Sequence, residues 1–300
     1  MMTPPQRIGL LGFGEVGQII GEELAASGSD LFAFDLKFSD PDSQPSYSAN
    51  SSPHITAVET AELLGVTCEM IFSAVTAEQT RMAATSVRNA IKPGTWFIDL
   101  NSASPAAKLN AANEVKESGG RYVEVAVMSP FPTKRLATPL LLGGPHAREF
   151  QHLAASMGWS ATDAFSEIYG PASAAKMCRS VMVKGIEALL VESLVTARSF
   201  GVEKTVLSSL DDLFPGPDWS ALARYMIGRA LEHGGRRAEE MREVAKTVQE
   251  ADIEPHMSRA TVSVQDWAKR YPQIQDLQDL DMVLDALCDA PRQQTTRATS

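Results

Sequence analysis

The stretch that most constrains the fold is IGLLGFGEVGQIIGEELAASG, residues 8–28. Its apolar start is typical of a buried strand; three closely spaced glycines and an amphipathic helical pattern follow. The spacing Gly12-Phe13-Gly14-Glu15-Val16-Gly17 is GxGxxG. Between a strand and a helix, these glycines permit a tight turn, the approach of a pyrophosphate and close helix–strand packing. The stretch therefore predicts a dinucleotide site at a helix N-terminus; the alternative is a glycine turn without a ligand.

The second predicted strand ends in Asp35, close to the expected spacing after the glycine loop. A carboxylate there binds the ribose hydroxyls and repels a 2′-phosphate, which favours NAD as the cofactor. Lys37 could pair with that phosphate instead, so NADP stays open. Glu15 opposes a pyrophosphate, and we expect it to turn toward ribose hydroxyls or the nicotinamide. The alternative for Glu15 is a solvent-facing carboxylate in the first turn of the helix.

The first half of the chain alternates apolar runs with helical patterns. The runs that predict strands are 7–12, 31–35, 68–75, 95–100, 121–128 and 139–144, with weaker ones at 54–58 and 159–164. The helical patterns between them are 15–27, 59–65, 77–91, 104–118 and 146–157. This alternation predicts a parallel, doubly wound sheet with helices on both faces. The polar segment 39–53 predicts a surface loop.

After Gly170-Pro171 only helical periodicity remains. A run of helix-compatible residues, apolar almost all round, predicts one long buried helix over about 171–200. Further helices are predicted at 203–213, 218–232, 235–251, 256–270 and 275–288. The fold class is α/β: a Rossmann-type domain over 1–168, then an all-helical substrate and dimerisation domain over 169–290, joined by the long helix. The polar segment 291–300 predicts a disordered tail.

Composition narrows the range of partners. With 27 Lys and Arg against 37 Asp and Glu, the net charge of −10 argues against binding to nucleic acid. The three cysteines are far apart and form no CxxC pair, so we expect reduced thiols and no metal site. No signal peptide precedes the first strand, and glycines interrupt its apolar run. We therefore expect a cytoplasmic protein without a membrane segment.

Polar residues follow three of the predicted strands, at the edge where doubly wound sheets bind ligands. The first candidates are Thr76 after its strand, with Ser73 and Val75 from the end of that strand. Asn101 and Ser102 follow the next strand, and Ser129 follows the third. We expect the first group to contact the cofactor and the other two groups to contact the substrate. Ser104 precedes Pro105 and is assigned to the cap of the next helix.

Lys176 lies in the apolar stretch ASAAKMCRSVMVKG near the start of the long helix. A buried lysine is costly unless it is paired or functional, and burial lowers its pKa toward the range useful for proton transfer. Ser180 and Lys184 follow at intervals of one turn. The alternative is that Lys176 extends to solvent.

These motifs together resemble the β-hydroxyacid dehydrogenase superfamily, which includes 3-hydroxyisobutyrate and 6-phosphogluconate-type dehydrogenases. The resemblance covers nearly the whole chain. It rests on the glycine loop GFGEVG and on a later GG after a strand. It also rests on DLNSASP, where the family has D-x-S-T-x-S-P, and on GPASAAK, where the family has G-x-x-G-x-x-x-K. It implies that Lys176 is the catalytic acid/base and that Asn101 and Ser102 bind substrate and nicotinamide. It also implies a homodimer with interlocking helices.

Two departures from the family pattern bear on the substrate. Ser180 stands where the family has asparagine, and Met128-Ser129-Pro130 replaces S-G-G. Pro130 has no N–H to offer a substrate carboxylate. The chain therefore resembles a divergent branch of the superfamily.

A cluster of His233, Arg236 and Arg237 stands out in this acidic chain. We expect His233 and Arg237 to face the cleft and help to hold an anionic substrate in place of the missing amide. The alternative is a solvated helix start in which the arginines pair with Glu239 and Glu240.

The predicted reaction is hydride transfer between the nicotinamide and the carbinol carbon of a small, anionic hydroxy compound, with Lys176 carrying the hydroxyl proton. One alternative is an imine reductase of the same architecture, a class that tolerates loss of the lysine. Another is a non-catalytic dinucleotide-binding sensor or scaffold. The presence of Lys176 argues mildly against the imine reductase, and it favours an enzyme over the sensor or scaffold.

Overall fold

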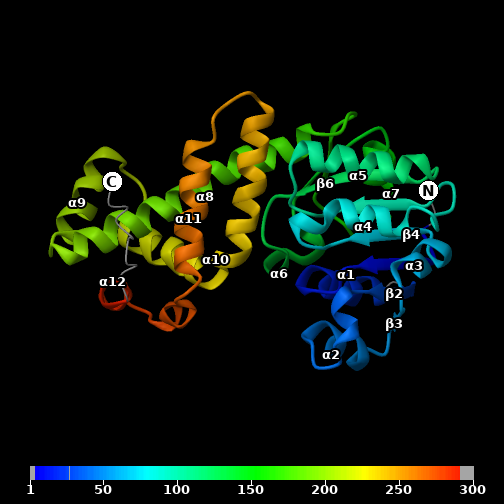
Figure 1. The fold of residues 1–300 in the computed structure, drawn as a ribbon, viewed down its shortest axis with the longest axis horizontal. Helices are drawn as coiled ribbons and strands as arrows, with labels where there is room; N and C mark the ends of the chain where they lie inside the picture. The colour runs from blue at the N-terminus through cyan, green and yellow to red at the C-terminus, as the bar shows by residue number, and fades with distance from the viewer. Residues whose placement is uncertain (1–3, 27, 291–300) are drawn as a thin grey trace, which may run out of the picture. The chain divides into compact units, whose positions relative to one another are not determined.

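The computed structural model describes residues 4–26 and 28–290 (Figure 1). By internal contacts the chain divides into unit 1, Met1–Arg179 with Lys246–Ile253, and unit 2, Ser180–Ala245 with Glu254–Ser300. The first division falls inside the long helix, whereas the sequence pattern placed a domain boundary between 168 and 169. The expected tail at 291–300 lies outside the described residues.

Unit 1 is built on one sheet in the strand order β3-β2-β1-β4-β5-β6-β7-β8. The strands are β1 (Arg7–Leu11), β2 (Asp30–Phe34), β3 (Ile55–Ala57), β4 (Met70–Ser73), β5 (Trp96–Asp99), β6 (Arg121–Val127), β7 (Leu140–Gly143) and β8 (Thr162–Ser166). Neighbouring strands are parallel except β6 and β7. The predicted doubly wound sheet is confirmed, and its strand order reverses beside β1, where such sheets bind ligands.

Helices cover both faces of this sheet. On one face the apolar cluster includes side chains from α1 (Glu15–Ala25) and α7 (Ala147–Ser156). The cluster on the other face includes α3 (Ala61–Thr67), α4 (Thr80–Val87) and α5 (Pro105–Glu117). Adjacent residues of β1 point to opposite faces: Leu10 belongs to the first cluster and Leu11 to the second. This two-sided burial explains the continuous apolar strands in the sequence.

The prediction of a surface loop at 39–53 is wrong, because this segment contains the helix α2 (Gln44–Ser51). The Ser43 hydroxyl caps the helix by accepting from the Ser46 N–H, and a proline lies in its first turn. The Ser46 hydroxyl donates to the Asp40 carbonyl at 2.8 Å. Polar caps stabilise this helix more than an apolar face does, so hydrophobic periodicity does not reveal it.

The second part of the chain is helical, as predicted. Its helices are α8 (Pro171–Ser199), which begins in unit 1, then α9 (Glu203–Leu213), α10 (Trp219–Glu250), α11 (His256–Ala268) and α12 (Leu280–Asp289). The prediction of separate helices at 218–232 and 235–251 is wrong, because α10 continues through Gly234. A Cβ on Gly234 would lie 2.7 Å from the Gln265 carbonyl oxygen. This glycine therefore allows α10 and α11 to approach closely.

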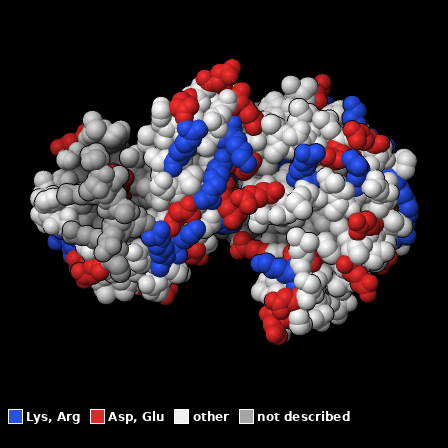
Figure 2. Space-filling model, in the orientation of Figure 1, with Lys and Arg blue, Asp and Glu red and all other residues white. Residues whose placement is uncertain are grey.

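Basic and acidic side chains are interspersed on the face shown in Figure 2. Within the described residues, no helix is both long and apolar enough to cross a membrane. In the same part of the chain, no group of three His, Cys, Asp or Glu side chains is arranged to hold a metal ion.

Candidate functional site

The glycine loop between β1 and α1 has two positions where only glycine fits. Gly12 has φ of +95°, and a Cβ there would lie 2.5 Å from the Ala74 carbonyl oxygen. A Cβ on Gly17 would lie 2.2 Å from the Gly12 carbonyl oxygen. A Cβ on Gly14 would meet no atom within 4 Å. The loop therefore packs tightly at its two ends and leaves open space at its middle glycine.

That open space lies at the N-terminus of α1. Gly14 is the N-cap residue, and no described side chain accepts a hydrogen bond there. The first N–H groups of a helix have no partner within it and attract anions. Phe13 and Val16 on either side of Gly14 pack with the apolar cluster. The residues present thus fit the pyrophosphate of a nicotinamide dinucleotide.

Asp35 fixes the loop from the end of β2. Its carboxylate accepts from the Phe13 N–H at 2.8 Å and from the Lys37 N–H at 2.9 Å. Each carboxylate oxygen can accept a further hydrogen bond, so the capacity to bind ribose hydroxyls remains. Asp35 is half-buried and the Lys37 side chain is exposed.

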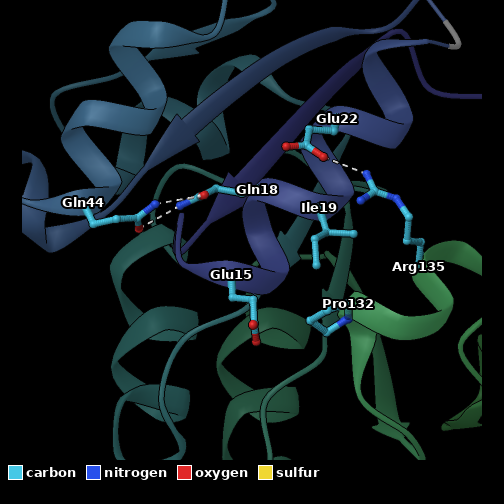
Figure 3. A pocket seen from close by; sticks show the side chains of 7 residues that line it. All are labelled: Glu15, Gln18, Ile19, Glu22, Gln44, Pro132 and Arg135. Carbon is cyan, nitrogen blue, oxygen red and sulfur yellow. Dashed lines mark hydrogen bonds and ion pairs between the residues drawn. The ribbon is translucent and has the colours of Figure 1, made fainter. Parts of the chain in front are cut away.

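A pocket of about 430 Å³ lies along α1, and Figure 3 shows its lining. Gln18 and Gln44 bond to each other across it at 3.1 Å, and Gln18 also donates to the Phe13 carbonyl at 2.8 Å. Arg135 pairs with Glu22 at 2.7 Å. Glu15 lines the same pocket and is exposed. Its lining mixes acidic, basic and amide groups.

Asn101 joins the ends of β4 and β5. Its Oδ1 accepts from the Val75 N–H at 2.7 Å, and its Nδ2 donates to the Ser73 hydroxyl at 3.0 Å. Both Ser73 and Asn101 are buried, while Thr76 is exposed. The Asn101 amide thus holds two of the predicted cofactor-contacting residues in place. Its predicted contact with substrate stays a prediction.

Lys176 lies beside Ser102, the neighbour of Asn101. The Lys176 Nζ is 2.5 Å from the Ser102 Oγ. Both side chains are half-buried, and both belong to unit 1. The sequence motifs singled out these two residues separately, and the structure brings them together at the carboxyl edge of β5.

Two buried carboxylates bond to the segments that carry Ser102 and Lys176, and neither of them was assigned a role from the sequence. Asp99 pairs with Lys108 at 2.9 Å, and its Oδ1 accepts from the Asn101 N–H at 2.9 Å. Tyr122 donates to Asp99 at 2.5 Å, and burial beside that carboxylate raises the pKa of Tyr122 well above its ordinary value.

The second carboxylate, Glu124, holds the start of α8. Its two oxygens accept from the Gly170 and Ser173 N–H groups, each at 2.6 Å. The sequence does contain one sign of this residue's role: Glu124 is the single acidic residue inside the otherwise mostly apolar strand RYVEVAV.

The loop after β6 carries the predicted substrate residue Ser129. Its hydroxyl oxygen is buried and forms no hydrogen bond with the described residues. The next residue, Pro130, precedes the short helix α6 (Phe131–Lys134). A buried hydroxyl without a partner is costly, so Ser129 is available for a polar group of a ligand.

The remaining predicted substrate residues lie in unit 2, where each faces a partner. Arg237 is buried against Glu187, and burial opposes the charge of both by raising the pKa of Glu187 and lowering that of Arg237. Ser180 accepts from Lys184 at 3.3 Å. Burial, and to a lesser extent the nearby Arg236 charge, lowers the pKa of His233 below its ordinary 6.5.

The expected cationic cluster is thus neutralised within unit 2. Arg236 lies 3.7 Å from Glu240, which also pairs with Lys184 at 2.5 Å. Burial opposes a positive charge on His233 by lowering its pKa, and its Nε2 lies 3.2 Å from the Glu232 carboxylate. The alternative considered from the sequence was that these arginines pair with nearby glutamates at the start of a helix. Arg236 does pair with Glu240, but both residues lie in the middle of α10 and not at a helix start. The predicted roles of His233, Arg237 and Ser180 toward substrate stay predictions.

Comparison with known families covers most of the chain. Residues 7–163 match the NAD binding domain of 6-phosphogluconate dehydrogenase, and residues 197–268 match a domain of unknown function (DUF1932). The solved structure of a conserved hypothetical protein from Sinorhizobium meliloti 1021 is similar over 96% of each chain, with 33% identity and a TM-score of 0.75.

Two enzymes are similar at lower identity. The mitochondrial 3-hydroxyisobutyrate dehydrogenase of Homo sapiens is 22% identical over 71% of this chain and 63% of its own length. The 2-(hydroxymethyl)glutarate dehydrogenase of Eubacterium barkeri is 22% identical over 68% of this chain and 67% of its own length. The chain thus spans about two thirds of each of these enzymes.

Proposed function

This chain belongs to the β-hydroxyacid dehydrogenase superfamily, and from that premise we propose that it is a nicotinamide-dependent dehydrogenase or reductase acting on the CH–OH group of a small hydroxy acid. The observation that carries the proposal is the 2.5 Å contact between the Lys176 Nζ and the Ser102 Oγ at the carboxyl edge of the sheet. Ligands of doubly wound sheets bind at that edge.

Lys176 is the proposed general acid/base. In oxidation its neutral amine accepts the proton of the substrate hydroxyl as the carbon–oxygen double bond forms. In reduction the ammonium returns that proton to the carbonyl oxygen. When bound, the nicotinamide supplies the hydride acceptor or donor. Ser102, whose hydroxyl accepts from Lys176, is the proposed second partner of the same substrate oxygen.

The names of the two similar enzymes suggest a substrate class. Both 3-hydroxyisobutyrate and 2-(hydroxymethyl)glutarate carry a hydroxymethyl group on the carbon next to a carboxylate. We propose that this protein acts on a compound of that type. Pro130 cannot donate to the carboxylate, so the buried Ser129 hydroxyl is the proposed donor in that loop.

We propose NAD rather than NADP as the cofactor. Asp35 is held beside the glycine loop by two backbone N–H groups, so its carboxylate cannot easily swing away from a 2′-phosphate. Titration with NADH and NADPH, followed by nicotinamide fluorescence, tests this. We expect NADH to bind at least about fivefold more tightly, because a like charge at about 4 Å costs from about 1 kcal/mol in water to about 4 kcal/mol near a protein surface. Tighter binding of NADPH would show that Lys37 governs the choice.

The lysine assignment predicts the effect of Lys176→Ala. We expect kcat with NAD and 3-hydroxyisobutyrate or 2-(hydroxymethyl)glutarate to fall about 10²–10⁴-fold, with the Kd for NADH nearly unchanged. Lys116→Ala, on the last turn of α5, is the matched control and should retain full activity.

Other outcomes separate the rival functions. Unchanged turnover in Lys176→Ala would remove the lysine from the chemistry. Reduction of imines by the wild-type protein without turnover of any hydroxy acid would favour an imine reductase. Binding of NADH by the wild-type protein without turnover of any hydroxy acid or imine would favour a sensor or scaffold. The homodimer and the cytoplasmic location stay predictions, which gel filtration with light scattering and cell fractionation would test.

A further inference from the structure

Glu124 is a buried carboxylate on an interior strand of the sheet. It lies on β6 with no exposed surface, and its partner in the register of β5 and β6 is Asp99. Side chains of paired residues point to the same face of a sheet. Two acidic residues therefore lie next to each other in the interior of unit 1.

Each of these carboxylates holds one side of the Lys176–Ser102 contact. Asp99 accepts from the Asn101 N–H, one residue before Ser102. Glu124 accepts from the Gly170 and Ser173 N–H groups at the start of α8. Ser173 lies three residues, almost one helical turn, before Lys176. Fixing the first turn of α8 fixes the backbone from which Lys176 extends.

The surroundings of Glu124 are shaped for a carboxylate. A Cβ on Gly143 would lie 2.8 Å from the Glu124 Oε2, so the glycine leaves room for that oxygen. At Gly144, with φ of +104°, a Cβ would lie 2.1 Å from the Tyr169 ring, the residue just before Gly170. An anion at a helix N-terminus is also favourable to the helix dipole. The two glycines at the end of β7 thus serve the turn that leads into α8.

We propose that Glu124 is a positioning residue for Lys176: it sets the first turn of α8 so that the lysine amine meets Ser102. The catalytic meaning of this contact rests on the proposed function, but the contact itself does not. Loss of the Glu124 charge should release the amine from Ser102 while leaving the glycine loop and Asp35 as they are.

The test is Glu124→Gln in the full-length protein. An amide keeps the shape of the side chain but can accept through one atom only, so one of the two helix N–H groups loses its partner. Lys176 is labelled with acetic anhydride between pH 6 and 10, and its acetylation rate is followed by peptide mass spectrometry. We expect the rate at pH 8 to rise about tenfold, and the rate at Lys116 to stay constant.

Glu69→Gln is the matched control. Glu69 also accepts from two backbone N–H groups, those of Gln6 at 2.7 Å and Arg7 at 3.2 Å, but at the beginning of β1. It should leave Lys176 labelling unchanged. An unchanged Lys176 rate in Glu124→Gln, or an equal rise in both variants, would overturn the proposal.

A second variant covers the case in which Glu124→Gln does not fold. Gly143→Ala keeps every charge and pushes the carboxylate from its place, and it should raise Lys176 labelling in the same direction by a smaller factor. No rise in that variant would count against the proposal.

Turnover separates this proposal from the proposed function. If Glu124→Gln raises labelling and lowers kcat with an unchanged Kd for NADH, both are supported. If labelling rises but Lys176→Ala keeps full turnover, Glu124 still positions Lys176 and the assignment of the lysine to catalysis fails.

Discussion

Three acidic residues of unit 1 bond to backbone N–H groups that border the candidate site. Asp35 holds Phe13, Asp99 holds Asn101, and Glu124 holds Gly170 and Ser173. Spacing from the glycine loop was enough to predict Asp35. Asp99 is the first residue of the motif DLNSASP and bonds to Asn101 two positions on, but the motif alone did not assign it that role. Glu124 bonds to a segment more than forty residues away, and no motif spacing encodes that contact.

The same limit applies to single residues predicted to bind substrate. Lys176 and Ser102 were recognisable because a lysine in an apolar helix and a hydroxyl at a strand end are unusual for their surroundings. Asn101 has the same strand-end pattern, yet its amide bonds to Val75 and Ser73. Arg237 looked cationic because Glu187, its partner, is fifty residues away. Sequence identifies the polar residue but not its partner.

His146 gives a prediction for pH dependence. Burial, and then the nearby Arg121 charge, lowers the pKa of His146 below its ordinary 6.5. The unfolded chain therefore binds the proton first, so this residue lowers stability as the pH falls below about 6.5. His146→Phe keeps a ring beside Trp96 and removes the titrating group. We expect its thermal midpoint to decline less than that of the wild type between pH 7 and 5.

His152 serves as the control for that measurement, because it lies in α7, the helix that begins just after His146, and its side chain is exposed. His152→Phe should follow the wild-type pH dependence. Equal flattening in both variants would mean that the burial of His146 is not the cause.

At the scale of elements, long periodic segments were the predictable part. The strands, α8, and α9 at Glu203–Leu213 follow from apolar periodicity. Two predictions at this scale were wrong. The helix α2 was missed because serine hydroxyls stabilise it, and α10 was divided into two helices on either side of Gly234. Glycine indicates either a helix end or a close packing contact, and only the neighbouring helix decides between them.

Gly234 in α10 gives a matched pair of variants with Gly185 in α8. A Cβ on Gly234 meets the Gln265 carbonyl oxygen and Lys269, whereas one on Gly185 meets nothing within 4 Å. Gly234→Ala should cost about 1–3 kcal/mol of stability from overpacking. Gly185→Ala should stabilise the protein by up to about 1 kcal/mol through helix propensity. Urea unfolding monitored by circular dichroism measures both, and a stable Gly234→Ala would contradict the packing role.

At the scale of the whole molecule, the order of element types in the sequence determined the fold class. Strands that alternate with helices predict a doubly wound sheet, and the helices that follow without strands predict a separate helical region. The division of the chain was harder to read, because it falls within helices: α8 passes from unit 1 to unit 2 after Arg179, and α10 passes back after Ala245. Composition does not change at either point.

The return of Lys246–Ile253 to unit 1 has a consequence for biosynthesis. Within that segment Glu250 accepts from the Ala106 N–H, at the beginning of α5, at 3.1 Å. A nascent chain that has emerged from the ribosome only as far as α8 carries the whole sheet, yet the first turn of α5 still lacks this acceptor. The nucleotide-binding unit is therefore finished late in translation, after most of the helical unit has been made.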